Sequence, residues 1–178
     1  MGLQVHGGMG FIEETGAAGY YRDARIAPIY EGTNGIQAID LVTRKLPQSG
    51  GEHVLDYIGE LRLDVEAVRG SNLPGFGQSA DRIGVALDHL DAATLFLQRA
   101  TGAGRISEAL AGATPYLRLF ALAAGGAYLA RGAVAEGSAP RIALCRFFAD
   151  NLLAETAALS GRVTEGAESL EQAASALA

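Results

Sequence analysis

The stretch EHVLDYIGELRLDVEAV, residues 52–68, decides the fold class because its apolar residues return at a helical spacing. Val54, Ile58, Leu61, Val65 and Val68 follow one another at steps of three and four residues. That spacing places all five side chains on one face of an α-helix. The stretch therefore predicts an amphipathic helix that buries this face against other helices.

Similar stripes recur in three later segments of the chain. They cover residues 83–97, 117–131 and 142–163, each predicted as one helix, and Thr94 fills the only polar step of the first. The breakers between the four helices are GSNLPGFG (70–77), TGAG (101–104) and EGSAP (136–140). Short glycine- and proline-containing loops favour antiparallel neighbours. The sequence predicts an all-α fold with an antiparallel four-helix domain over residues 48–178, and residues 165–178 either add a short helix or fray.

The first 47 residues differ from the rest in their glycine content and in the length of their predicted helices. Glycines cluster in HGGMG (6–10), a helix is predicted from about Glu13 to Arg25, and the loop IAPIYEG (26–32) follows. A second helix is predicted from Thr33, whose hydroxyl suits an N-cap, to about Lys45. LPQSGGE (46–52) has the composition of a linker. We therefore expect one domain over residues 1–47 and another over 48–178.

Composition limits the classes of partner. The net charge of −6 and the pI of about 5.0 disfavour binding of nucleic acid. The longest apolar run, residues 119–130, has twelve residues, fewer than the ~20 that a membrane span needs. The opening MGLQVHGGMG lacks a secretory signal, and the single cysteine, Cys145, fits a reducing compartment. We expect a cytoplasmic protein without a membrane span, and no pattern in the sequence predicts a metal site.

Glu31 is a candidate catalytic acid with two interpretations. An acid beside a glycine, just before a helix, is commonly a solvated loop residue that the helix N-terminus favours. Alternatively, Ile29 and Tyr30 before it could help to exclude water in a closed site. A carboxylate shielded from water is a stronger base and could remove a weakly acidic proton from carbon. The residues alone leave both interpretations open.

The glycine cluster is also open to two interpretations. Gly7 and Gly8 could form a simple turn, since glycine permits positive φ, or could let a phosphate approach the backbone. The segment matches neither a Walker loop nor a dinucleotide fingerprint, because no strand precedes it. His6 could contact a phosphate or have no role. Neither choice is decided by the residues.

The stretch QVHGGMGFIEETGAAGYYRDARIAPIYEGTNGIQAIDLVTRKL, residues 4–46, resembles the C-terminal end of the catalytic region of acyl-CoA dehydrogenases. The resemblance rests on Gln-x-x-Gly-Gly, RDAR and IYEGTNGIQ at these spacings. It implies FAD-dependent α,β-dehydrogenation of an acyl-CoA thioester, with an electron-transferring flavoprotein as the acceptor of the electrons. It also implies a homo-oligomer, because in this family one subunit contacts FAD held mainly by its neighbour.

The resemblance assigns roles to matching positions of this chain. Glu31 would be the catalytic base, and Tyr30 and Gly32 beside it would contact the substrate. The residues assigned to FAD are Gln4, His6, Gly7, Gly8, Thr33 and Asn34. The acyl chain length is not implied, because most of the pocket in this family comes from segments that this sequence does not contain.

Residues 50–178 resemble the helical C-terminal extension of a subset of this family, which packs on neighbouring subunits and restricts the substrate entrance. We expect this chain alone to be inactive without the remaining domains. The alternative is a non-catalytic helical module for oligomerisation or docking, which the amphipathic stripes alone would also explain.

Six other side chains carry structural expectations. His53 and His89 are expected on the surface, and Cys145 in an apolar core. Arg22, Asp23 and Arg25 are expected to form a local set of ion pairs that braces the Glu31 loop.

Overall fold

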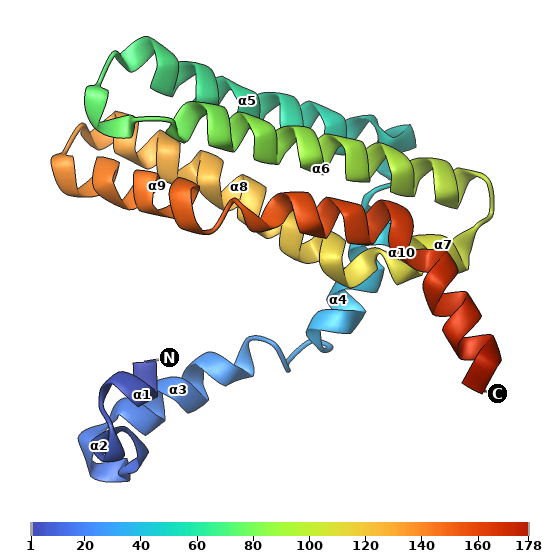
Figure 1. Cartoon of the computed structure of the whole chain (residues 1–178), viewed down its shortest axis with the longest axis horizontal. Coiled ribbons are helices and arrows are strands. Elements are labelled where there is room, and N and C mark those ends of the chain that lie inside the picture. Colours follow the sequence, from blue (N-terminus) through green and yellow to red (C-terminus); the bar gives the residue numbers. More distant parts are fainter. Residues whose placement is uncertain (1, 178) are drawn as a thin grey trace. The chain divides into compact units, whose positions relative to one another are not determined.

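A computed structural model describes residues 2–177, apart from the side chain of Glu171, and contains only helices and turns in that range. The all-α prediction is therefore confirmed. The described residues divide into two compact units, the first ending at Gln37 and the second beginning at Ala38. Figure 1 shows the course of the chain through each unit. The predicted domain boundary at residue 47 stays a prediction.

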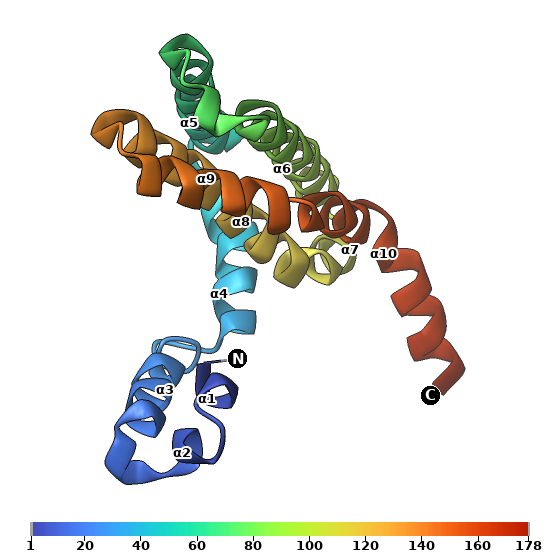
Figure 2. The same ribbon diagram turned by 60° about the vertical axis from the view of Figure 1, so that its left-hand side comes forward.

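The second unit is built from long helices. They are α5 (Glu52–Ser71), α6 (Ser79–Gly102), α8 (Ala113–Glu136), α9 (Ala139–Asn151) and α10 (Glu155–Leu177), with a short α7 (Ile106–Ala111) between α6 and α8. Helix α8 packs against α5, α6, α9 and α10. Figures 1 and 2 show α5 and α6 running side by side in opposite directions, with α9 and α10 along α8. This is the predicted antiparallel arrangement, with α7 as an addition that the sequence analysis did not predict.

The core of the second unit contains the apolar residues of the predicted stripes. Ile58 and Leu61 of α5 lie against residues of α6 and α8, and all are almost inaccessible to water. The largest fully buried aliphatic side chains are Ile58, Leu61, Ile83, Leu87, Leu90, Leu97, Leu119, Val42 and Val163. Cys145 is buried among them, as expected, and burial raises the pKa of its thiol. Each such aliphatic side chain stabilises the fold by about 1.5–3 kcal/mol.

The fourth predicted helix is interrupted, which corrects the expectation of one helix over residues 142–163. Helix α9 ends at Asn151, and α10 begins at Glu155. At the break, the amides of Leu152 and Leu153 both donate to the carbonyl of Phe148, at 2.9 and 3.3 Å. After the break, the Leu153 carbonyl accepts hydrogen bonds from both the amide and the hydroxyl of Thr156, at 3.0 and 2.7 Å. The final residues extend α10 to Leu177.

Buried polar groups in the second unit are paired. The Thr94 hydroxyl donates to the Leu90 carbonyl at 2.7 Å, so the Tyr116 hydroxyl, 2.7 Å from Thr94, donates to it. Tyr116 is fully buried, and this burial raises the pKa of its phenol. Asp64 accepts two hydrogen bonds from Arg131, at 2.8 and 3.0 Å. These pairs connect α6 to α8 and α5 to α8.

The first unit consists of short helices. They are α1 (Gly2–Val5), α2 (Gly8–Phe11), a 3₁₀ turn at Glu13–Thr15, α3 (Ala17–Ile26) and the beginning of α4 (Asn34–Asp40), which continues into the second unit. The predicted helix from Glu13 therefore becomes α-helical only after Gly16, which has φ +79°. A π-helical turn at Leu41–Lys45 replaces the end of the other predicted helix. Among residues 2–37, only Gly10 is buried.

Within residues 2–177, no helix combines the length and the apolar character that crossing a membrane demands.

Candidate functional site

The candidate acid, Glu31, lies in a tight turn after α3. The amides of Ile29 and Tyr30 both donate to the Ile26 carbonyl, at 2.9 and 3.0 Å, which closes a turn at the end of that helix. Glu31 follows with φ +56°, a left-handed conformation that is uncommon for a residue with a side chain. Such a conformation costs about 1 kcal/mol or more and is often found at functional sites.

Gly32 and Gln37 hold the backbone of this turn. Gly32 has φ +94°, and a Cβ atom there would lie 2.9 Å from the side chain of Ile36. The Gln37 side chain donates through Nε2 to the carbonyl of Glu31 at 2.7 Å. Any larger residue at position 32 would meet both a strained φ and a steric clash. The turn therefore has a defined local geometry that depends on glycine at this position.

The surroundings of Glu31 are apolar but open in this chain. Glu31 is exposed, and Ile29 and Tyr30 are each 55% exposed. Ile26 and Ile36, on either side of the turn, are exposed to a similar extent. The exclusion of water expected for a catalytic base would therefore require further protein or a ligand to cover this apolar surface.

The Gln4–Gly8 stretch forms the junction between α1 and α2. The Gly7 amide donates to the Gln4 carbonyl at 3.0 Å, and Gly7 has φ +60°. Gln4, His6, Gly7 and Gly8 are all exposed. No atom lies within 4 Å of the positions that Cβ atoms would take at Gly7 and Gly8, so the backbone there is accessible to a ligand.

Gly10 has a structural role that the glycine count alone did not reveal. A Cβ atom at this position would lie 2.2 Å from the carbonyl oxygen of Leu3. Only glycine therefore allows α2 to approach α1 this closely. Spacing along the sequence could not have shown this requirement, because it depends on the crossing of two short helices.

Thr33 and Asn34 stand at the start of α4. The Thr33 carbonyl accepts a hydrogen bond from the Gln37 amide at 3.0 Å, as expected of an N-cap residue. Both side chains are exposed. The hydrogen bonds described for residues 2–177 do not join Thr33 or Asn34 to the Gln4–Gly8 stretch.

The expected ion pairs around the Glu31 loop are corrected by the structure. Arg22 of α3 forms a bidentate pair with Glu13, one hydrogen bond of which is 3.0 Å long, and this pair fixes α3 to the preceding 3₁₀ turn. The hydrogen bond and charge of Arg22 lower the pKa of Glu13. The ion pairs described for residues 2–177 include neither Asp23 nor Arg25, so the turn itself, Gly32 and Gln37 brace Glu31.

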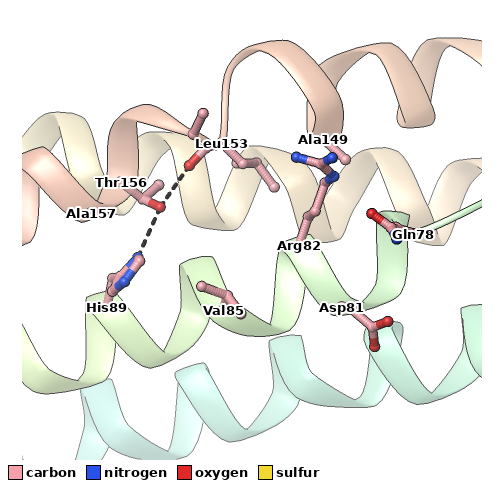
Figure 3. A pocket seen from close by; sticks show the side chains of 10 residues that line it. Gln78, Asp81, Arg82, Val85, His89, Ala149, Leu153, Thr156 and Ala157 are labelled. Carbon is pink, nitrogen blue, oxygen red and sulfur yellow. Dashed lines mark hydrogen bonds between the residues drawn. The ribbon is translucent and has the colours of Figure 1, made fainter.

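A second candidate site in the other unit was not predicted. It is a cavity of about 440 Å³ where α6 faces the break between α9 and α10. Figure 3 shows His89 of α6 directed at Thr156, and the distance between Nδ1 and Oγ1 is 3.0 Å. Because the Thr156 hydroxyl donates to Leu153, the His89 Nδ1–H donates to Thr156.

His89 is therefore half-buried and hydrogen-bonded, which corrects its assignment to the surface. His53 is exposed, as expected. A second stripe, which begins at Gln78 just before α6, could have revealed the cavity. Gln78, Arg82, Val85 and His89 recur at steps of four, three and four and all line it. Arg82 is paired with Asp150 at 3.0 Å. Three of the polar side chains that line the cavity, Arg82, His89 and Thr156, therefore already have partners in the protein.

Among the described residues, no cluster of histidine, cysteine and acidic side chains could hold a metal ion.

Two family models match consecutive parts of the chain. Residues 2–46 match the C-terminal domain of acyl-CoA dehydrogenase, and residues 57–174 match the model described as acetyl-CoA dehydrogenase C-terminal like. The first match contains the Glu31 turn and the Gln4–Gly8 stretch, and the second contains most of α5 to α10. The chain belongs to the acyl-CoA dehydrogenase family.

Individual relatives support both parts of this match. The chain is 39% identical over 184 residues to a 3-methylmercaptopropionyl-CoA dehydrogenase of Ruegeria pomeroyi, a match covering 96% of this chain and 30% of that protein. It is 42% identical over 59 residues to a butyryl-CoA dehydrogenase of Syntrophomonas wolfei, which covers 33% of this chain and 10% of the relative. A mitochondrial short-chain specific acyl-CoA dehydrogenase of Rattus norvegicus is 57% identical over 37 residues, 21% of this chain and 9% of that protein. The chain thus spans less than a third of the length of these relatives.

Proposed function

We propose that this chain supplies the catalytic acid of an FAD-dependent acyl-CoA dehydrogenase, with Glu31 as the base. The observation that carries the proposal is the Glu31 turn itself. An acid is held at φ +56° by Gly32 and by the Gln37 hydrogen bond, beside exposed apolar side chains, within the segment that matches the family. A local strain fixed by neighbouring residues is typical of functional sites.

In this proposal Glu31 accepts the proton from the carbon next to the thioester carbonyl. That proton is weakly acidic, so the carboxylate must be shielded from water to be an effective base. Ile29 and Tyr30 would supply part of this shield once the remaining protein covers them. Tyr30 and Gly32 flank the carboxylate and are proposed to contact the acyl-CoA substrate.

FAD, when bound, accepts the hydride that leaves the neighbouring carbon. The residues proposed to hold it in this chain are Gln4, His6, Gly7 and Gly8, together with Thr33 and Asn34. Two observations support this assignment: all six residues are exposed, and open space beside Gly7 and Gly8 leaves their backbone accessible to a dinucleotide.

The proposed partners follow from the same assignment. They are an acyl-CoA substrate, an electron-transferring flavoprotein and further copies of the subunit. The apolar surface of residues 2–37 would be covered by the segments that the longer relatives contain beyond the matched part. We propose that the chain is inactive until those segments are supplied, and that it works in the cytoplasm, where its single thiol would stay reduced.

The test is reconstitution. The chain is mixed with a polypeptide that carries the unmatched part of the Ruegeria relative, FAD is added, and acyl-CoA-dependent reduction of a dye acceptor is measured with 3-methylmercaptopropionyl-CoA and butyryl-CoA. Activity is expected only in the mixture. Glu31→Gln should lower it by about a thousandfold, since a general base contributes ~10²–10⁴-fold, while bound flavin is retained.

Glu14→Gln is the matched control, because Glu14 is an exposed acid in the same unit. It should leave both activity and flavin binding unchanged. A reconstituted enzyme whose rate is the same with Glu31→Gln would eliminate Glu31 as the base.

A non-catalytic docking or oligomerisation module is a second candidate function. The exposed apolar side chains of residues 2–37 favour it, including Val5, Phe11 and Tyr20, each more than 80% exposed. Light scattering of the purified chain tests it. Self-association that Phe11→Ser abolishes, without any activity in the mixture, would favour this second function, and a monodisperse monomer would exclude self-association.

A further inference from the structure

A small cavity of about 240 Å³ lies beside the π-helical turn in the second unit. It is lined by Leu41, Lys45 and Leu46 from that turn, by His53 and Tyr57 of α5, and by Phe120 of α8. All of these residues belong to the second unit. Its lining includes neither Glu31 nor any residue assigned to FAD, and it shares no lining residue with the larger cavity beside His89.

Aromatic side chains form one wall of this cavity. Tyr57 and Phe120 are stacked, with ring centroids 5.9 Å apart and planes within 5° of parallel. The Tyr57 hydroxyl is also hydrogen-bonded to Tyr128 at 2.9 Å, so the ring is held at both its face and its edge. Neither Tyr57 nor Phe120 is fully buried. A rigid and partly accessible aromatic wall is suited to packing against the flat ring of a ligand.

The π-helical turn places Lys45 at this wall. The Leu46 amide donates to the Leu41 carbonyl at 2.9 Å, a hydrogen bond that spans five residues instead of four. Pro47, which has no amide hydrogen, ends the helix directly afterwards. The wider turn brings Leu41, Lys45 and Leu46 to the same cavity. Single π turns of this kind are frequently found at functional sites.

Among the described residues that line the cavity, the ionisable side chains that can carry a positive charge are Lys45 and His53. Lys45 and His53 are both exposed at the cavity, and no acidic side chain of the described residues lines it. Asp40, one turn before Lys45, is paired with Arg44 through hydrogen bonds of 2.5 and 3.0 Å. Burial, and then the hydrogen bond to Tyr128, raise the pKa of Tyr57 to about 12, so its phenol stays neutral. An anion entering the cavity would meet Lys45, and the acids whose charges act on Lys45 and Tyr57, Asp40 and Glu60, are not among the lining residues.

We propose that this cavity binds a planar aromatic ring that carries one anionic group. The ring packs against Tyr57 and Phe120 and covers the apolar side chains of Leu41 and Leu46. The anionic group accepts hydrogen bonds from Lys45 and, when its imidazole is protonated, from His53. An aromatic carboxylate and a nucleotide both present this chemistry. The site is independent of the proposed dehydrogenase activity.

The experiment is a titration of the ¹⁵N-labelled full chain followed by amide chemical shifts. The probes are 2-naphthoate and adenosine 5′-monophosphate, each compared with its uncharged analogue, 2-naphthamide or adenosine. The expected result is saturable shifts at Lys45, His53 and Tyr57, with each anion bound about threefold or more tightly than its neutral analogue. Comparing the affinities of 2-naphthoate and adenosine 5′-monophosphate shows whether the site prefers an aromatic carboxylate or a nucleotide. Either preference supports the proposal.

Two variants measure separately what the positive charge and the aromatic wall contribute to ligand binding. Lys45→Gln should weaken anion binding about threefold and leave the binding of the neutral analogue unchanged. Phe120→Leu should weaken both. Arg99→Gln is the matched control, since Arg99 is an exposed cation at the end of α6 that does not line the cavity, and it should change neither. Retained dispersion of the amide spectrum verifies that each variant is folded.

The proposal is overturned if neither anion gives saturable shifts at these residues. It is also overturned if charged and neutral probes bind equally, or if Arg99→Gln reduces the affinity as much as Lys45→Gln does.

Discussion

The two units of this chain differ in how they use their apolar side chains. In the second unit the leucines and isoleucines of the helical stripes are buried, and Leu61, Leu87, Leu90 and Leu97 have no accessible surface. In the first unit, within residues 2–37, Gly10 is the only buried residue, and Phe11 is 89% exposed. Apolar content alone therefore does not produce a core; the helices must be long enough and numerous enough to face one another.

This difference has a functional meaning. A surface with so many exposed apolar side chains is typical of a segment that packs against other protein. The proposed catalytic acid lies in this open unit, whereas the closed unit contains a complete helical core. The open unit is therefore expected to gain its order and its chemistry together, when the remaining protein covers it.

The largest expected effect is the loss of a core leucine. Leu90→Ala should lower the free energy of unfolding of the second unit by ~2–5 kcal/mol, because the cavity it leaves in a packed core cannot collapse fully. Ile29→Ala, an exposed position of the first unit, should change the stability by less than ~0.5 kcal/mol. Urea denaturation followed by circular dichroism measures both, and similar losses would contradict the contrast between the units.

The buried hydrogen bond between α6 and α8 should contribute the next largest effect. Thr94→Val leaves the Tyr116 hydroxyl buried without its acceptor, so the free energy of unfolding should fall by ~1–3 kcal/mol. Tyr116→Phe should cost less, because Thr94 keeps its bond to the Leu90 carbonyl. The same denaturation experiment compares them, and the reverse order would disprove the assigned direction of donation.

A change at Gly10 should act within the first unit alone. Gly10→Ala places a methyl group 2.2 Å from the Leu3 carbonyl and should separate α1 from α2, at a cost of ~1 kcal/mol or more. Gly8→Ala, with open space around the new methyl group, is the control. In the mixture with a polypeptide that carries the unmatched part of the Ruegeria relative, where this unit is expected to be protected, amide hydrogen exchange of residues 2–11 should accelerate only in the first variant. Equal exchange in the two variants would argue against the close approach.

The smallest expected effect concerns the exposed pair of Glu13 and Arg22. Arg22 lowers the pKa of Glu13, so the carboxyl should titrate with a midpoint below its ordinary value of 4.5. Because the folded pKa is the lower one, the contribution of the pair is complete above pH ~4.5 and disappears as the pH falls through the folded value. Carboxyl NMR shifts measure the midpoint. Arg22→Gln should return it toward 4.5, and no movement would rule out the pair in solution.

The helices were predictable where the apolar spacing was long and regular. The stripe from Val54 to Val68 became α5, and Thr94, the polar step of the next stripe, became the partner of Tyr116. The break at residues 152–154 was missed because Ala149 before it and Thr156 after it, seven residues apart, are both buried and continue the helical spacing across it. Because the apolar spacing continues unchanged across residues 152–154, the spacing alone could not show that the helix is broken there.

The candidate site was less accessible to sequence reasoning than the fold. Residues 4–46 suggested Glu31 through a resemblance, but neither its positive φ nor the bond from Gln37 could be inferred from spacing. Arg22 was expected near Glu31 and instead pairs with Glu13, nine residues away, because the 3₁₀ turn brings that acid alongside α3. Such contacts depend on how turns fold the chain back, which apolar periodicity does not report.

Hydrogen exchange of the chain, alone and mixed with a polypeptide that carries the unmatched part of the Ruegeria relative, tests the central claim most directly. The account predicts rapid exchange for amides of residues 2–37 in the isolated chain and strong protection around Glu31 in the mixture. Amides of the buried faces of α5, α6 and α8 should be protected in both samples. Equal protection of residues 26–37 with and without the added polypeptide would contradict the claim that this unit is completed by the rest of the enzyme.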